Sequence, residues 1–154
     1  MRRILFATGL AACLALAACN KPAEAPAADA AAAPKKSLAR PAPLYAGQEQ
    51  VQSVQSGTIT VAPGGGVDLV AKATTDGAGW TQVGLLPRVY AATPPDGVYE
   101  IDVVAQKPTT PGAPGPTPVE AKAAWDKYKD GRVKGVTFIS KTNQVTVILG
   151  KATP

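Results

Sequence analysis

Histidine is absent from this chain of 154 residues, and cysteine and aromatic residues are scarce. Without histidine, the Ser-His-Asp and Cys-His nucleophile systems are excluded and the commonest metal ligand is missing. The two cysteines, Cys13 and Cys19, both lie before residue 20. Residues 20–154 therefore contain no disulfide, no thiolate nucleophile and no Cys-ligated zinc. Together with the lack of any recognisable catalytic constellation, this predicts a protein that is not an enzyme and needs no cofactor.

Charge is also scarce in most of the chain. The formal net charge is +5, from 16 Lys and Arg against 11 Asp and Glu. Residues 45–154 carry 10 Lys and Arg against 9 Asp and Glu, so this part is almost neutral. A sequence pI of about 9.3 would normally raise nucleic acid as a partner. Because the basic excess lies in the first 44 residues, the sequence argues against nucleic acid.

The N-terminus reads MRRILFATGLAACLALAAC. Arg2 and Arg3 form a short positive region, and an uncharged apolar stretch runs from Ile4 to Ala18. This stretch is shorter than the roughly 20 apolar residues that span a bilayer, and its length is typical of a signal peptide. The closing Leu-Ala-Ala-Cys at residues 16–19 resembles the lipobox of bacterial lipoproteins. That resemblance implies that residues 1–18 are removed and that Cys19 carries acyl chains such as palmitate.

The resemblance also implies a cellular location for the protein. Each buried CH₂ of an acyl chain contributes about 0.8 kcal/mol, so two or three chains on Cys19 would anchor it firmly. In enterobacterial lipoproteins, Asp directly after the lipidated Cys favours the inner membrane, and here that residue is Asn20. We expect an outer-membrane lipoprotein that faces the periplasm, rather than one in the inner membrane or at the cell surface. An ordinary secretory leader with an incidental Cys19 is the alternative.

A linker follows the anchor. Residues 20–44 are dominated by Ala and Pro, and their prolines interrupt every longer helical run. Residues 19–44 are therefore interpreted as the lipidated Cys and a semi-extended tether that holds a domain off the membrane. Residues 45–154 are expected to form a single globular domain.

The predicted domain is mainly β. It contains 30 large apolar or aromatic residues, 15 of which are Val, among many Gly and Pro. Alternation puts Val67, Leu69, Ala71 and Ala73 on one strand face. Six or seven such strands predict an immunoglobulin-like β-sandwich, or else a small open β-barrel. One short helix is expected near 119–128, where Ala and Glu are frequent.

Three acids could bind a metal ion. In the strand predicted at 98–105, Glu100 and Asp102 lie opposite the apolar face of Tyr99 and Ile101, and Asp96 precedes them in a turn. Their spacing matches no Ca²⁺ loop. A solvated strand face, or pairing with a cation such as Arg88, is the favoured interpretation, so no metal is expected.

Aromatic and proline residues are the candidate contacts for a ligand. Trp80, Trp125 and Tyr128 either pack in the core or offer stacking surface to a carbohydrate or peptide. The proline-rich segment 106–118 is long enough for a functional loop. Its candidate contact residues are Pro108, Pro111, Pro114 and Pro116.

These features predict a membrane-anchored, non-enzymatic binding module for a protein, peptide or glycan of the cell envelope. An inhibitor of an envelope protease or lytic enzyme, presenting the 106–118 loop, is the first alternative. A passive structural component of the envelope is the second.

Overall fold

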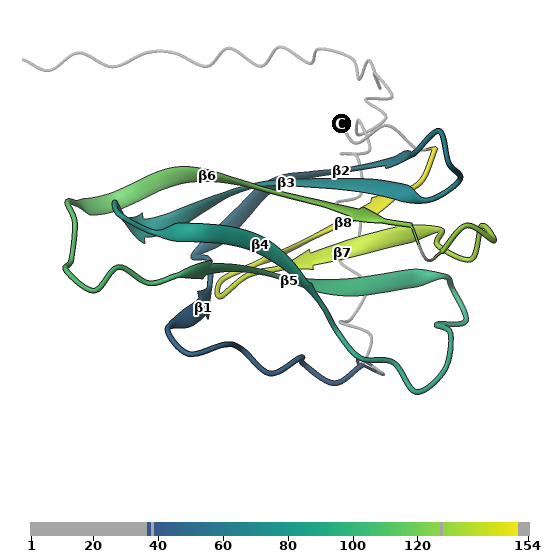
Figure 1. Ribbon diagram of the computed structural model, residues 1–154, viewed down its shortest axis with the longest axis horizontal. Coiled ribbons are helices and arrows are strands. Elements are labelled where there is room, and N and C mark those ends of the chain that lie inside the picture. Colours follow the sequence, from purple (N-terminus) through teal and green to yellow (C-terminus); the bar gives the residue numbers. More distant parts are fainter. Residues whose placement is uncertain (1–36, 38, 127, 151–154) are drawn as a thin grey trace, which may run out of the picture. The chain divides into compact units, whose positions relative to one another are not determined.

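The computed structural model describes residues 37, 39–126 and 128–150, and these form a mainly β domain of two sheets (Figure 1). The strands are β1 (Gln48–Gln50), β2 (Ser53–Val61), β3 (Val67–Gly77), β4 (Thr81–Pro87), β5 (Val98–Gln106), β6 (Pro114–Trp125), β7 (Gly135–Ile139) and β8 (Gln144–Ile148). Within these residues we find no helix, and hence none that could cross a membrane. The predicted leader 1–18, Cys19 and the tether as far as residue 36 lie outside the described residues.

Two sheets pack face to face as a sandwich. The first has the order β2-β3-β6, and the second joins β1, β4, β5, β7 and β8. β4 pairs along one edge of β5, while β7 and then β1 pair along the other. β5 and β7 are parallel, because the chain crosses to the other sheet as β6 before it returns. The prediction of a mainly β domain is confirmed, and the sheets do not close into one barrel.

The core lies between the sheets and follows the predicted alternation. Val67, Leu69, Ala71 and Ala73 on β3 are all buried, as are the inward-facing residues of β5. Phe138 is fully buried beneath β2, at the one place where β2 has a glycine facing inward. A Cβ atom on Gly57 would lie 2.4 Å from the Phe138 ring. The aromatic ring therefore fills the space that the missing side chain leaves.

The predicted helix at 119–128 is wrong. Its residues as far as Trp125 form the second half of β6, paired with β3 from Val67↔Trp125 to Ala73↔Val119. Exposure alternates along this half, with Ala121 and Trp125 buried and Glu120 and Lys122 exposed. Helix propensities differ by less than about 0.7 kcal/mol per ordinary residue, which is less than burial of a Trp side chain contributes. Tertiary packing therefore overrides the local preference.

The predicted 106–118 loop is shorter than expected, because its last prolines belong to β6. Pro114, Pro116 and Pro118 occupy alternate, exposed positions of the strand. In a strand, N–H groups of alternate residues point to the same edge. The three missing N–H groups would all point away from β3, so the prolines remove no hydrogen bond to β3. Only 107–113 form the connecting loop.

The partial alternation of residues 48–61 predicts one strand, but the chain changes sheet midway. The Val51 N–H donates to Val103 O of β5, and the next residue, Gln52, donates to Thr74 O of β3. One predicted strand thus becomes β1 in one sheet and β2 in the other. Eight strands are present in the described part of the chain, instead of six or seven.

The domain also begins earlier than residue 45. Residues 39–45, which we call the N-terminal strap, lie across the outer face of β5. The backbones of Arg40 and Val89 exchange two hydrogen bonds of 3.0 Å, and Ser37 Oγ donates to Glu100 Oε2 at 2.5 Å. These contacts join residues 39–44, assigned above to the tether, to the folded domain.

Candidate functional site

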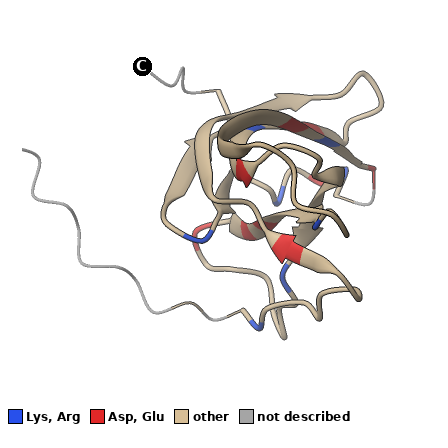
Figure 2. Ribbon diagram, turned by 90° about the vertical axis from the view of Figure 1, so that its left-hand side faces the viewer, with Lys and Arg blue, Asp and Glu red and all other residues tan. Residues whose placement is uncertain are grey.

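Four connections meet at one end of the sandwich, which we call the loop end (Figures 1 and 2). They are the β1–β2 junction, the β3–β4 turn, the β5–β6 loop and the β7–β8 turn. The Thr142 N–H donates to Gln52 O across two of them, and the Ala78 N–H donates to Ala113 O across the other two. Loops on a rigid β scaffold are common places for binding residues. The loop end is the place to look for a site.

Trp80 is fixed at the centre of the loop end. Its indole Nε1–H donates to Asp76 Oδ1 at 3.0 Å, across the β3–β4 turn. Lys141 Nζ lies 5.6 Å from the ring centroid, a cation–π distance. The side chain is half-buried and packs partly against the core. The ring is therefore held in place while part of it remains accessible.

Glu49 pairs with two lysines beside Trp80. Its carboxylate pairs with Lys141 Nζ at 2.7 Å and with Lys107 Nζ at 3.1 Å. The hydrogen bond from Lys141, followed by that from Lys107, lowers the pKa of Glu49 below its usual value. The carboxylate is thus ionised at neutral pH and orients Lys141 over the indole.

Trp80 and three of the predicted prolines line one hollow. This proline hollow has a volume of about 230 Å³ and is lined by Trp80, Pro108, Pro111, Pro114, Asp76 and Lys107, among others. It depends on close approach of the β3–β4 turn to the β5–β6 loop. A Cβ on Gly112 would lie 2.4 Å from Ala78 O, so only glycine fits there without movement. The structure thus brings together residues that are about 30 positions apart.

A second hollow lies beside the first and shares Asp76 with it. This polar hollow measures about 550 Å³, and its polar side chains include Gln52, Ser53, Gln55, Thr74, Asp76 and Thr142. The hydroxyls of Ser53 and Thr74 are 2.7 Å apart, and Gln55 Nε2 donates to Ser53 Oγ at 3.2 Å. Pro116 also lines it, so the four predicted prolines divide between the two hollows.

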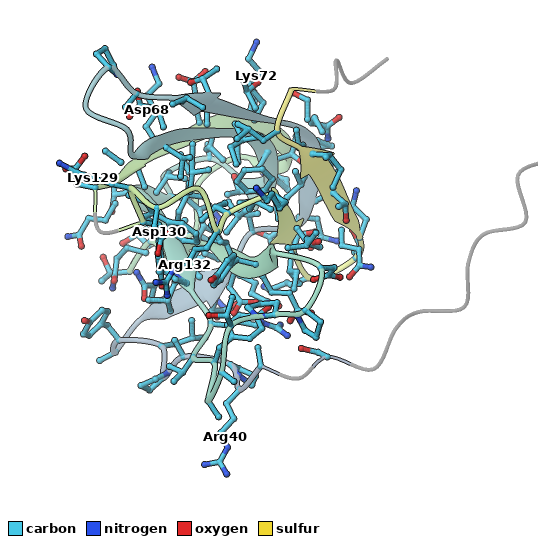
Figure 3. All side chains as sticks on the ribbon, turned by 90° about the vertical axis from the view of Figure 1, so that its right-hand side faces the viewer. Arg40, Asp68, Lys72, Lys129, Asp130 and Arg132 are labelled. Atoms are coloured by element: carbon cyan, nitrogen blue, oxygen red, sulfur yellow. The ribbon has the colours of Figure 1, made fainter. Side chains whose placement is uncertain are left out.

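Trp125 and Tyr128 are at the other end of the sandwich. Trp125 is 7% exposed and meets Tyr99 and Tyr128 in an aromatic cluster with centroid separations of 5.3–6.0 Å. Arg132, paired with Asp130, lies 5.8 Å from the Tyr128 ring centroid (Figure 3). Burial gives Trp125 a core role and leaves little of it for a ligand, while Tyr128 is half-buried.

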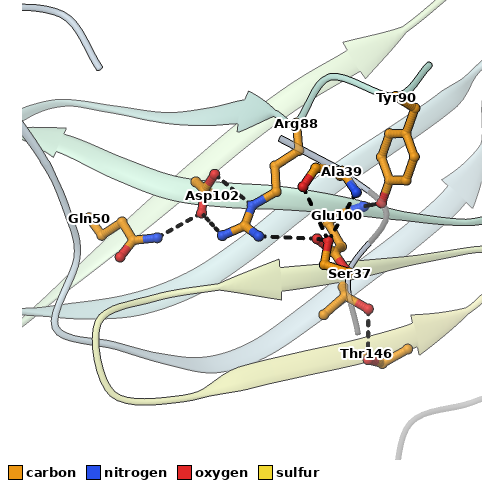
Figure 4. A network of polar contacts seen from close by, with 9 residues as sticks. Ser37, Ala39, Gln50, Arg88, Tyr90, Glu100, Asp102 and Thr146 are labelled. Carbon is orange, nitrogen blue, oxygen red and sulfur yellow. Dashed lines mark hydrogen bonds and ion pairs between the residues drawn. The ribbon is translucent and has the colours of Figure 1, made fainter. Parts of the chain in front are cut away.

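Glu100 and Asp102 surround a guanidinium group (Figure 4). Arg88 Nε and Nη2 donate to the two oxygens of Asp102 at 3.0 and 2.9 Å, and Nη1 donates to Glu100 Oε2 at 3.1 Å. The hydrogen bond to Asp102 is the main reason that the pKa of Arg88 is raised. The expected pairing with Arg88 is confirmed.

A solvated strand face was expected for these acids. This expectation is wrong for Asp102, which is 2% exposed beneath the strap. The Oδ1 atom of Asp96 accepts the Val98 N–H in the turn before β5. The described residues contain no group of three or more side chains placed to hold a metal ion. The positive charge between Glu100 and Asp102 is supplied by the protein itself.

Several residues of the site were not predicted, chiefly Asp76, Glu49, Lys141 and the polar side chains of the second hollow. Asp76 had a usable signal, because Asp-Gly-Ala-Gly-Trp places an acceptor and an indole donor on either side of a tight turn. Glu49 and Lys141 had none, since they are 92 residues apart. Comparison of the chain with known protein families, with curated proteins and with solved structures finds no match.

Proposed function

We propose that this protein is a lipid-anchored component of the cell envelope whose β domain is a non-enzymatic binding module, with its site at the loop end. One observation carries the proposal. Trp80, Pro108, Pro111 and Pro114, each a candidate contact residue on chemical grounds, line a single hollow. A fixed indole beside rigid proline rings offers apolar contact at little cost in side-chain entropy.

The lipobox-like sequence at residues 16–19 supports the membrane anchor, and Asn20 favours the periplasmic face of the outer membrane. For the fold we propose a variant of the immunoglobulin-like sandwich. Two packed sheets support this comparison, while the parallel β5–β7 pair departs from the antiparallel ladders of that architecture.

The anchor is tested by changing Cys19 to alanine. We expect the full chain expressed in a bacterial host to move from the membrane fraction to the soluble fraction, or to keep its leader, because no sulfur remains to be acylated. Immunoblots of both fractions and an intact-mass measurement check this. Cys13→Ala is the matched control and should remain membrane-bound. A Cys19→Ala protein that has lost residues 1–18 and still fractionates with the membrane would contradict the lipid anchor.

The binding role is tested by changing Trp80 to alanine. Immobilised full-length protein is incubated with solubilised envelope extract, and retained molecules are identified by mass spectrometry. We expect retention to fall about tenfold or more, because a central aromatic anchor usually dominates a binding site. Val61→Ala, an exposed apolar residue at the far end of β2, is the control. Equal retention by the wild type and Trp80→Ala would rule out the loop end as the binding site.

The inhibitor alternative uses the same end of the molecule. Residues 109–113 of the β5–β6 loop are exposed and would be the segment presented to a protease or lytic enzyme. This alternative requires that the retained partner is such an enzyme and that its activity falls in the complex.

A further inference from the structure

We propose that the ligand of the loop end is a neutral oligosaccharide, bound across Asp76 with one sugar ring in the proline hollow and the next in the polar hollow. This inference rests on the proposed binding function and names the ligand class for the same site. The two hollows together measure several hundred Å³, within the range of small-ligand sites. Asp76 lines both, so a ligand that occupies them passes over its carboxylate.

The polar hollow suits hydroxyl groups. Ser53, Thr74 and Thr142 carry hydroxyls, and Gln52 and Gln55 carry amides, so each can donate and accept hydrogen bonds. A sugar hydroxyl also does both, and a chain such as Gln55–Ser53–Thr74 can pass polarisation along to it. The Asp76 carboxylate accepts from Trp80 through Oδ1 and has further lone pairs for sugar hydroxyls.

The charges favour a neutral ligand over an anionic one. None of the described residues that line the polar hollow is Lys or Arg, and Asp76 gives it a negative charge. Lys107 lines the proline hollow, Lys141 lies over the Trp80 ring, and both are paired with Glu49. Glu49 and Asp76 together balance the charges of these two lysines, so a phosphate, a sulfate or an acidic sugar would meet no net positive charge here.

The proline hollow suits the apolar face of a sugar ring. Trp80 and the three prolines supply flat, rigid surface against which C–H groups can pack. Addition of a peptide strand at the adjoining edge is disfavoured, because Pro114, Pro116 and Pro118 lack the N–H groups that would point towards it. The fixed indole and the blocked edge together favour a sugar over an extended peptide.

The test measures binding of named probes to the full-length protein in a detergent without a sugar head group. Cellotetraose, maltotetraose and chitotetraose are the neutral probes, tetragalacturonate is the anionic probe, and decaproline is the peptide probe. Isothermal titration calorimetry gives the affinities. We expect at least one neutral tetrasaccharide to bind, and tetragalacturonate to bind more weakly.

Asp76→Asn and Trp80→Ala are each expected to weaken that binding about tenfold or more, because hydrogen bonds to a charged acceptor and central aromatic contacts are the strong terms. Asp76→Asn retains an acceptor for the indole N–H, so it tests the charge without releasing Trp80. Asp68→Asn is the matched control, because Asp68 is exposed on the same strand about 25 Å away. It should leave the affinity unchanged, and melting curves check that each variant is folded.

The outcomes separate the ligand class from the binding function. Two outcomes would overturn the assignment of an oligosaccharide ligand but leave the proposed binding function of the loop end in place. One is binding of decaproline and of no other probe. The other is Trp80-dependent retention of a molecule from the extract when no probe binds. Sugar binding that is insensitive to both Asp76→Asn and Trp80→Ala would place the sugar elsewhere and overturn the inference. No probe bound and no Trp80-dependent retention would overturn both proposals.

Discussion

Replacing Asp102 with alanine is expected to lower the free energy of unfolding by about 3 kcal/mol, the lower end of the range for breaking a buried ion pair. Asp102 is 2% exposed and accepts two hydrogen bonds from Arg88 and one of 2.7 Å from Gln50. Without it, the guanidinium would stay in a site where its side chain is only 15% exposed. Glu100 would remain as a partner, which is why the lower end of the range applies. Urea denaturation at pH 7 measures the change.

The control for this prediction is Asp68→Ala, which removes an exposed carboxylate from β3 and should change stability by no more than about 0.5 kcal/mol. A double replacement, Arg88→Met with Asp102→Leu, removes both charges at once. It should cost less than Asp102→Ala alone, because no unpaired charge is left under the strap. An Asp102→Ala loss below about 1 kcal/mol would show that the network is more hydrated than its burial indicates.

Replacing Asn143 with alanine is expected to cost about 2–4 kcal/mol, because two backbone groups of one buried residue lose their partners. Asn143 Oδ1 accepts from the Val54 N–H, and Asn143 Nδ2 donates to Val54 O, both at 2.8 Å. The β2–β3 pairing shifts register between Val54 and Ser56. The side chain from the β7–β8 turn thus bonds both backbone groups of Val54 and ties the two sheets together.

Two further variants test whether the effect comes from the hydrogen bonds of the Asn143 side chain. Asn143→Asp retains the acceptor for the Val54 N–H but, when ionised, places a carboxylate oxygen against Val54 O in place of a donor, so it should also lower the free energy of unfolding. Gln144→Ala changes the exposed neighbouring residue and should change stability by less than about 0.5 kcal/mol. Urea midpoints of all three variants give the comparison. Equal stability of Asn143→Ala and the wild type would mean that water replaces the amide.

The strand pattern was predictable where one face is buried and the other is exposed. The alternation of Val67, Leu69, Ala71 and Ala73 corresponds directly to burial in β3, because side chains alternate across a strand. At 119–128 the local signal was misleading, since Ala121 and Ala123 favour a helix in isolation but pair with β3 in the fold.

The candidate site was predictable in its residue types and not in its geometry. Trp80 and the prolines could be chosen because aromatic and proline side chains offer rigid apolar surface. Among their partners, Asp76 was marked only by the tight turn that it shares with Trp80. Glu49 could not be chosen, because it reaches Lys141 only after the chain has changed sheet at Val51. Similarly, nothing local marks Asp102 as buried, since its burial depends on a strap more than 50 residues earlier.

The sequence by itself determined that the domain is mainly β, that residues 20–154 have neither histidine nor thiol chemistry, and that the N-terminus resembles a lipobox. These follow from composition, from alternation and from one short motif, all of which are local properties of the chain. Only the tertiary structure decided the sheet switch between β1 and β2, the strap over Arg88 and Asp102, and the two hollows that share Asp76. The physical reason is that each of these depends on hydrogen bonds or close packing between segments far apart in sequence, whose pairing is selected by the shared core and not by either segment alone.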